Sequence, residues 1–437
     1  MREQFIHFVW QYRRFNHSGL KTTEGLPVEI IKQGKLNEQD GPDFLDARIR
    51  IGDTIWAGHV EIHVKSSDWI RHKHASDPKY KNVILHVVYE HDREDLQLGF
   101  PTLELSGLIP RSIYERYLFL MQSASILPCH HLISEVDESV INIYKSRLLV
   151  ERMEDKIRKI EILLEQTRYD WDQVSWIWLV RYFGSGVNCD TFQELAAKVR
   201  FQWISRLSGD PADIQALLMG MAGLLAEETE EEYVRDLKIR YDFLVNKWNL
   251  QPVPPFWWRW KQSRPAAFPS LRLAQLAVLM ENMHSIFREI LDVDALKLKI
   301  TRIRPESYWN EHYRLNKASV YKVKPLTIDF ANRLIINVSV PLMLAYARYS
   351  SDAAMIESAF SVLDNLPAED NKITRMMSDQ GFSNNCASDS QAILHLKHHY
   401  CDQKKCLNCV IGNKIITTRQ YEIGISDVNL EIHEACV

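Results

Sequence analysis

The sequence lacks the long apolar runs that export or membrane insertion requires. Its first residues, MREQFIHFVWQYRRF, place Arg, Glu, Gln and His among their apolar positions, so they lack the apolar core of a secretory signal. The most apolar later run starts at Leu334. It contains Asn337, Ser339 and Pro341, and it falls short of the roughly 20 apolar residues of a membrane span. We therefore expect a cytoplasmic protein that does not associate with a membrane.

Cysteine is scarce, and neither sign of charge dominates. Seven cysteines in 437 residues, an odd number, do not indicate a disulfide framework. The formal net charge of −4 gives no basic signature, so any contact with nucleic acid has to come from local patches. With 46% hydrophobic and 25% charged residues, the composition is that of a soluble globular protein with about two or three cores.

Three segments of different character follow one another along the chain. Residues 1–110 predict a mixed α/β domain, in which an amphipathic helix precedes the strands PVEII, DARIRI, TIWAGHVEIHV and NVILHVVYEH. Gly52 and Asp53 predict a hairpin turn between the second and third of these strands. Residues 111–365 predict a mainly helical domain with long segments such as MEDKIRKIEILLEQ and DIQALLMGMAGLLAEETEEEYVRDLKI, and residues 366–437 a small cysteine module. The predicted fold class is α+β.

One strand of the N-terminal domain carries three titratable side chains on the same face. In HVEIHVK, Glu61, His63 and Lys65 alternate with aliphatic residues, so an extended backbone points them to one side of a sheet. Such a face is either a solvated sheet surface or one wall of an active site. His86 interrupts the next apolar strand, which lies near Glu61 if consecutive strands are neighbours.

The acids near this strand suit a metal-dependent hydrolase. Cleavage of a phosphodiester with a metal ion needs carboxylates that hold Mg²⁺ or Mn²⁺ and a polarising group beside the attacking water. Asp43 follows Pro42, a hairpin intervenes, and Glu61 precedes His63 by two positions. Over about residues 27–90 this order resembles the core of the PD-(D/E)XK nucleases. The resemblance implies a restriction-endonuclease-like sheet domain in which Asp43 and Glu61 bind the metal.

The sequence departs from the nuclease pattern at the lysine. His63 occupies that position, and Lys65 lies on the same face one pleat further along. We expect His63 or Lys65 to orient water or to stabilise charge. His72 and His74 in the following loop offer an alternative, because with an acid they would bind Zn²⁺ and give a metallohydrolase of another class.

A second candidate metal site lies in the C-terminal module. CDQKKCLNC places Cys401, Cys406 and Cys409 at spacings that let three thiolates meet on one ion or cluster. Plant-type ferredoxins share this spacing, so Zn²⁺ and an iron–sulfur cluster are both candidates, and some PD-(D/E)XK nucleases contain such clusters. The alternative is a helical hairpin with reduced thiols. Several residues compete for the place of the fourth ligand: Cys386, His395, His398, His399 and Cys436.

A tryptophan-rich segment offers a possible nucleic-acid contact. QPVPPFWWRWKQSRPAAFPS, residues 251–270, interleaves aromatic and basic residues, which suits stacking on bases and contacts with phosphates. Its prolines exclude a regular helix. Packing of Trp257, Trp258 and Trp260 between helical layers is the stronger interpretation.

Over nearly its full length the chain resembles an uncharacterised bacterial family, a domain of unknown function. The resemblance rests on LKTTEGLPVEII, GPDF, WAGHVEIHVKSSDW, NVILHVVYEHD, RPAAFPSLRLAQLA and YCDQKKCLNCVIG. It implies no activity, so the leading hypothesis rests on the residues: a nuclease-like protein that uses a metal to hydrolyse phosphodiester bonds in DNA or RNA. The competing hypothesis is a noncatalytic scaffold for nucleic acid or protein with a structural metal site. The sequence gives no indication of the oligomeric state.

Overall fold

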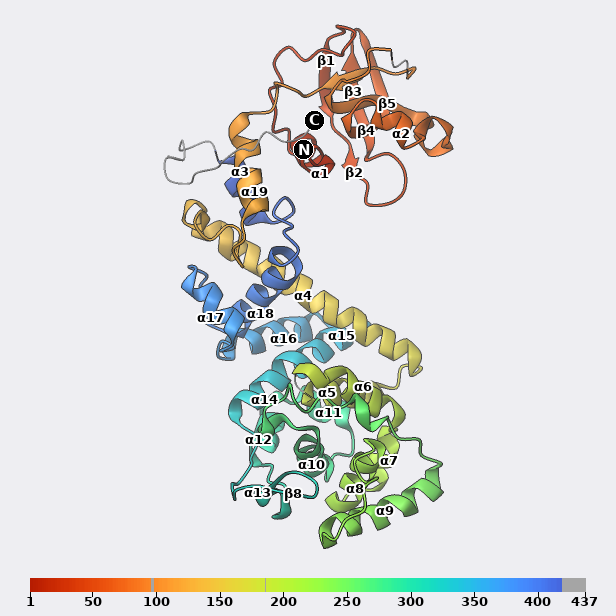
Figure 1. The fold of residues 1–437 in the computed structure, drawn as a ribbon, viewed down its shortest axis with the longest axis vertical. Helices are drawn as coiled ribbons and strands as arrows, with labels where there is room; N and C mark the ends of the chain where they lie inside the picture. The colour runs from red at the N-terminus through yellow and green to blue at the C-terminus, as the bar shows by residue number, and fades with distance from the viewer. Residues whose placement is uncertain (96–97, 185, 419–437) are drawn as a thin grey trace. The chain divides into compact units, whose positions relative to one another are not determined.

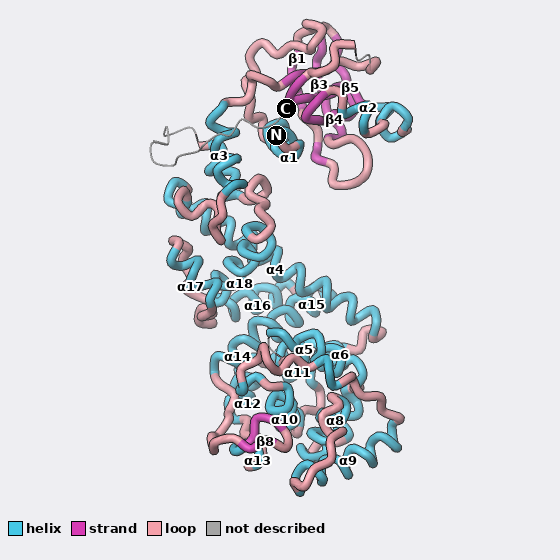
Figure 2. Tube along the Cα trace, viewed as in Figure 1, coloured by secondary structure: helices cyan, strands magenta, loops and turns pink. Residues whose placement is uncertain are grey.

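The computed structural model describes residues 1–95, 98–184 and 186–418, which form two compact units (Figure 1). The first unit contains residues 1–144 and the segment from residue 396 onward, and the second contains residues 145–395. The boundaries predicted at residues 110 and 365 thus fall inside these units. Figure 2 shows strands gathered in the first unit and helices throughout the second, apart from one short strand pair. The α+β class is as the sequence predicts.

A mixed sheet forms the core of the first unit. The hairpin predicted at Gly52 and Asp53 is confirmed, since it joins two antiparallel strands, β3 and β4. The next two pairings, β4 with β5 and β5 with β6, are parallel. Among the described residues the sheet has the order β1 (Val28–Lys32), β3 (Phe44–Ile51), β4 (Thr54–Lys65), β5 (Val83–Glu90) and β6 (Thr102–Glu104), with β2 (Lys35–Leu36) paired to β3.

A crossover and the N-terminal helix cover β4. Because parallel strands need a long connection, the chain between β4 and β5 forms a crossover of short helical turns. This crossover and α1 both pack against β4, and they bury residues 60–63 completely or nearly so. The centre of the predicted polar face is therefore dry. The covering elements are α1 (Glu3–Gln11), α2 (Asp68–Arg71), η1 (His74–Ser76) and η2 (Pro78–Asn82).

Two segments that are far apart in the sequence complete the first unit. The returning C-terminal helix α19 packs against α3 and η3, which follow the sheet (Figure 1). Arg116 joins them, because its Nη1 donates to the carbonyl of Ile415 at 2.8 Å. These elements are α3 (Arg111–Gln122), η3 (Ile133–Glu135), the start of α4 (Glu138–Gln166), η8 (Leu396–Cys401) and α19 (Val410–Thr417).

Several helices of the second unit begin at side-chain caps. Asp170, Asp210 and Thr327, for example, each accept a hydrogen bond from a backbone N–H in the first turn of the helix that follows. The main helices are α5 (Trp171–Phe183), α6 (Cys189–Lys198), α7 (Phe201–Arg206), α8 (Pro211–Met221), α9 (Glu232–Trp248), α10 (Pro269–Met280), α11 (Ile286–Leu291), α12 (Val293–Arg302), α16 (Ala353–Asn365), α17 (Lys372–Asp379) and α18 (Ala387–His395). The short strand pair is β7 (His312–Arg314) and β8 (Lys317–Ala318).

One long predicted helical segment is two helices. The run DIQALLMGMAGLLAEETEEEYVRDLKI divides into the end of α8 and the start of α9. The break follows from Gly223, whose φ of +69° is left-handed and ends α8 in the way that glycine commonly ends helices. The periodicity of the apolar residues alone does not reveal this break.

The most apolar run is a core helix of the second unit. Residues 328–350 form a continuous helix of α14 (Ile328–Leu334), the π-helical η7 (Ile335–Ser339) and α15 (Val340–Ser350). Within the described part of the chain it is the one helix long and apolar enough to cross a membrane, but 78% of its apolar window is buried inside the protein. Pro341 lacks the N–H that would bond the carbonyl of Asn337, and Trp178 Nε1 donates to that carbonyl instead at 2.9 Å. This helix is therefore integrated into the unit by a specific hydrogen bond.

The tryptophan-rich segment contributes to packing in the second unit. Trp258 is buried, and its Nε1 donates to the carbonyl of Ala222 at 2.8 Å. Trp260 packs edge-on against Phe268, with ring centroids 5.4 Å apart, whereas Trp257 is exposed. Packing thus accounts for two of these three indole rings.

Candidate metal centre

Asp43 and Glu61 lie side by side where the β3–β4 hairpin opens. The N–H of Asp43 donates to Glu61 Oε2 at 3.1 Å. In return, the N–H of Ile62 donates to Asp43 Oδ2 at 2.9 Å. Each carboxylate is thus held by the backbone of the other strand, and the structure brings together the two acids that the sequence predicts as metal ligands.

The loop before β3 fixes the position of Asp43. Gly41 adopts a φ of +116°, which glycine tolerates far better than other residues. Asn37 closes the loop, because its N–H donates to the carbonyl of Asp43 at 2.7 Å. Just after Asp43, Asp46 adopts a left-handed φ of +58° and the register of β3 with β4 shifts. Such bulges re-aim side chains next to functional sites.

Histidines from three elements gather beside the Glu61 carboxylate. His63 follows on β4, His86 is the register partner of Glu61 on β5, and His72 and His74 come from the crossover. His63 Nδ1 lies 2.9 Å from His86 Nε2, and His63 Nε2 lies 3.1 Å from His72 Nδ1. Glu61 Oε1 lies 3.2 Å from His74 Nε2 and 3.5 Å from His63 Nε2. The proximity of His86 to Glu61 is as the sequence predicts.

Three of these imidazoles are close enough to share one ion. One ring nitrogen each of His63, His72 and His74 lies within 4.8 Å of the others. His63 is buried, His74 is half-buried and His72 is exposed, so the trio runs from the core to the solvent. Trp69 packs edge-on against His63, and Tyr80 stacks on His74 with ring centroids 3.9 Å apart. Aromatic packing therefore restricts the orientation of two of the rings.

The surroundings of Glu61 favour the protonated form of its carboxyl group. Burial, the Asp43 carboxylate and Glu3 raise the pKa of Glu61 to about 9, against the lowering effect of the Asp43 N–H. Within the described residues Glu61 contacts no Lys or Arg, and its ion-pair partners are His63 and His74. Burial and the neighbouring imidazoles lower the pKa of His63 to about 2, so this ring is neutral. A buried carboxylate among neutral imidazoles and a second acid needs a cation in order to be ionised.

The opening helix contributes two residues that the sequence reasoning missed. His7 Nε2 lies 3.3 Å from Asp43 Oδ2 and 3.9 Å from Glu3 Oε1. Burial and the Asp43 carboxylate raise the pKa of Glu3. The sequence does contain a signal for this pair. Residues four positions apart share one face of a helix, so the spacing of Glu3 and His7 predicts that both side chains point the same way.

Lys65 lies at the end of the strand, away from these contacts. Its Nζ is 3.8 Å from Glu90 Oε2, and both side chains are about half exposed. The described contacts join Asp43, Glu61 and His63 to one another, whereas those of the Lys65 side chain lead to Glu90. The catalytic roles of all four residues stay predictions.

The predicted cysteine ligands lie on the segment that returns to the first unit. Cys406 and Cys409 are buried, and Cys401 is half-buried. The six cysteines within the described residues form no disulfide. Among the predicted fourth ligands, Cys386 and His395 belong to the second unit, and Cys436 lies outside the described residues.

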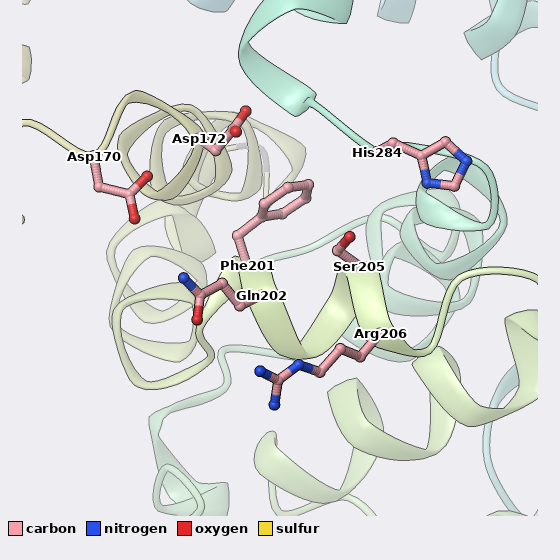
Figure 3. A pocket seen from close by; sticks show the side chains of 7 residues that line it. All are labelled: Asp170, Asp172, Phe201, Gln202, Ser205, Arg206 and His284. Carbon is pink, nitrogen blue, oxygen red and sulfur yellow. The ribbon is translucent and has the colours of Figure 1, made fainter.

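A hollow in the second unit offers less chemistry than the histidine cluster. Figure 3 shows its lining, and its volume is about 260 Å³. Asp170 caps α5 by accepting from the N–H of Gln173, and Asp172 accepts from the N–H of Phe287 at 2.9 Å. Its acids therefore have structural partners. The lining residues are Asp170, Asp172, Phe201, Gln202, Ser205, Arg206 and His284.

Comparison with known proteins gives a family but no activity. A family model described as a protein of unknown function (DUF2851) matches residues 3–372. No curated protein and no solved structure matches the chain. The matched span contains the whole histidine and carboxylate cluster and ends before Cys401.

Proposed function

The chain belongs to the family of proteins of unknown function DUF2851, and we propose that it is a metal-dependent phosphodiesterase that cleaves nucleic acid. One observation carries the proposal. The buried Glu61 carboxylate lies beside Asp43 and within 3.5 Å of two neutral imidazoles, and no Lys or Arg of the described residues pairs with it. A divalent cation would complete this arrangement, because it would let the buried Glu61 carboxyl group ionise beside Asp43.

The donor set fits a divalent ion of a first-row transition metal. Glu61, His63, His72 and His74 would hold the ion, with Asp43 next to it. Mixed imidazole and carboxylate donors favour Mn²⁺ or Zn²⁺ over Mg²⁺, which prefers oxygen ligands. His74 Nε2 is buried, lies 3.2 Å from Glu61 Oε1 and makes no hydrogen bond within the described residues, so it is available to bind the ion. When bound, the ion would offset the charge that develops on phosphorus and activate water for attack.

Two further histidines have supporting roles in this proposal. The contact of His63 Nδ1 with His86 Nε2 fixes the orientation of the His63 ring, as a hydrogen bond behind a metal ligand commonly does. His7 Nε2 lies 3.3 Å from Asp43 Oδ2 and would fix the orientation of that carboxylate in the same way.

Two features support a phosphodiester as the substrate. The first is the resemblance to the PD-(D/E)XK nucleases, since Asp43, a hairpin and Glu61 follow in that order and the two acids do meet. The second is the charge of the crossover that carries His72 and His74. Its exposed cations would contact phosphates beside the cluster, and they are Arg71, Lys73, Lys79 and Lys81.

The test is cleavage of single- and double-stranded DNA and RNA by the full chain with Mn²⁺, Zn²⁺ or Mg²⁺. Asp43→Asn and Glu61→Gln each remove a carboxylate that would stabilise the bound ion. We therefore expect each variant to lower the cleavage rate on the order of 10³-fold. Glu29→Gln is the matched control, because Glu29 is an exposed acid of the same sheet that pairs with Arg50 at 2.5 Å. We expect this variant to cleave like the native protein.

Two outcomes would contradict the proposal. Equal cleavage by all variants would assign the activity to a contaminant. No cleavage by the native protein with any of these ions would favour the noncatalytic scaffold, in which the cluster serves only structure.

A further inference from the structure

The turn that carries the C-terminal cysteines has a fixed and compact backbone. The N–H of Lys405 donates to the carbonyl of Tyr400 at 2.9 Å, and the N–H of Cys409 donates to the carbonyl of Lys405 at 3.1 Å. A Cβ atom on Gly412 would lie 2.3 Å from the carbonyl oxygen of Cys406. Only glycine therefore allows α19 to approach the turn so closely, and the backbone holds Cys406 and Cys409 near each other.

This turn is tied to the part of the first unit that contains Cys129. Lys404 Nζ donates to the carbonyls of Met121 and Ser123 at 2.9 and 3.0 Å. On the far side of Cys129 in the sequence, η3 packs against α19. Cys129 thus lies on a short connection, both ends of which contact the cysteine-bearing segment, and it is buried.

The four thiols share one buried neighbourhood. Burial, Cys409 and Cys406 raise the pKa of Cys129 to about 12. Burial also raises the pKa of Cys401, and Cys409, Cys129 and Cys406 raise it further. Electrostatic effects of this kind decline with distance, and together with the contacts of Lys404 and of η3 they place Cys129 in the same buried neighbourhood as the three cysteines of the turn.

The surroundings suit a negatively charged sulfur cluster. Lys404 acts on Cys406 and Lys397 acts on Cys401, in each case in the direction that favours the thiolate. Tyr144 is buried beside Cys409, and burial and Cys409 together raise its pKa. The protein thus places cations, and an aromatic cover, next to thiols that are otherwise buried.

We propose that Cys129, Cys401, Cys406 and Cys409 form a four-thiolate metal centre that fastens the returning C-terminal segment to the region between α3 and α4. This centre is separate from the proposed catalytic site and does not depend on it. Four thiolates bind Zn²⁺ or an iron–sulfur cluster, and each thiol loses its proton when it binds. The role of this centre is structural, because all four positions are taken by the protein.

The test measures zinc, iron and acid-labile sulfide in the full chain purified without oxygen. All proteins carry Glu61→Gln, which weakens binding of an ion at the histidine cluster, so the difference in metal content between these proteins reports the cysteines. We expect about one Zn²⁺ per chain, or iron with sulfide and a visible charge-transfer absorption. Cys129→Ser is expected to lose this metal, whereas Cys189→Ser is the matched control, because Cys189 is a partly buried cysteine of the second unit.

If the Cys129→Ser variant fails to fold, a second measurement tests the proposal without it. Cobalt replaces the metal in the Glu61→Gln chain, and the intensity of the thiolate-to-cobalt absorption reports the number of sulfur ligands. We expect the intensity that four thiolate ligands give. Metal retained in full by Cys129→Ser, or an intensity of three thiolates or fewer, would overturn the assignment of Cys129. A chain that holds neither zinc nor iron, even after incubation with zinc or with iron and sulfide, would overturn the centre itself.

Discussion

The two units surround a buried ionisable group in different ways. In the helical unit, Lys156 Nζ donates to Asn337 Oδ1 at 2.9 Å and to Gln391 Oε1 at 3.0 Å. In the sheet unit, Glu61 is buried beside the Asp43 carboxylate and neutral imidazoles. The helical unit supplies two oxygen acceptors for the Lys156 amine, whereas in the sheet unit no Lys or Arg of the described residues pairs with Glu61. A satisfied polar network is a structural device, whereas a buried acid without a positively charged partner would be stabilised by a bound cation.

The same contrast extends to the surroundings of each group. Burial and Arg152 lower the pKa of Lys156, and the Glu369 carboxylate opposes this effect. Gln391 joins the network, because its Nε2 donates to Glu369 and its Oε1 accepts from Arg152. Each of these polar groups has a protein partner of the complementary kind. Glu61 has no such positively charged partner in the described residues.

The largest expected effect on stability is that of a metal on the sheet unit. A ligand that binds only the folded state at 100 times its dissociation constant raises the free energy of unfolding by about 2.7 kcal/mol. We therefore expect Mn²⁺ to stabilise the native chain by about this amount and to leave Glu61→Gln nearly unaffected, as measured by thermal unfolding. Equal stabilisation of both proteins would show that Glu61 is not a ligand.

The helical unit provides the next test. Lys156→Met leaves Asn337 Oδ1 without its donor in the core, so we expect the free energy of unfolding to fall by about 1–3 kcal/mol in urea denaturation. Mn²⁺ stabilisation of the sheet unit should persist in this variant. Lys159→Met is the matched control, since Lys159 is exposed on the same helix. A loss no larger than that of the control would remove the structural role assigned to Lys156.

The pH dependence of the metal-free protein provides a third test. The pKa of Glu61 is raised from 4.5 to about 9 in the folded state, so the folded state binds a proton that the unfolded state releases. The contribution of Glu61 to the free energy of unfolding is fully present below pH 4.5, and it is lost as the pH rises toward about 9. Between neutral pH and pH 8 the native protein should lose at most about 1.4 kcal/mol per pH unit relative to Glu61→Gln. Parallel stability curves for the two proteins would contradict the raised pKa.

Lys65→Ala should have the smallest effect. The pair of Lys65 with Glu90 is about half exposed, and exposed ion pairs contribute about 0.2–1 kcal/mol. We expect a change in unfolding free energy within that range and a far smaller loss of cleavage than for Glu61→Gln. A loss of cleavage as large as that of Glu61→Gln would place Lys65 in the reaction.

Much of the site follows from local sequence patterns. The hairpin turn at Gly52 and Asp53, the shared face of Glu61 and His63 and the nearness of His86 depend only on the pleat and on neighbouring strands. The motif that contains Asp43 and Glu61 predicts that these acids meet, and they do.

Other features depend on contacts that no local pattern encodes. The crossover folds back over β4 and brings His72 and His74 to Glu61, and this requires the tertiary packing of Trp69 and Tyr80. The burial of residues 60–63 has the same origin. Cys129 is separated from Cys401 by the entire helical unit, so the spacing within CDQKKCLNC cannot reveal it.

The most direct test of the central claim, that Glu61 binds a metal, is a calorimetric titration of the metal-free chain with Mn²⁺. Mn²⁺ suits carboxylate and imidazole more than thiolate, so the cysteines do not interfere. At a pH between 4.5 and about 9, Glu61 is protonated in the folded metal-free chain. Titrations in buffers of different ionisation enthalpy should therefore show release of about one proton per ion by the native chain. Glu61→Gln should bind more weakly and release none. Binding of equal affinity and equal proton release in both proteins, or no binding at all, would contradict the claim.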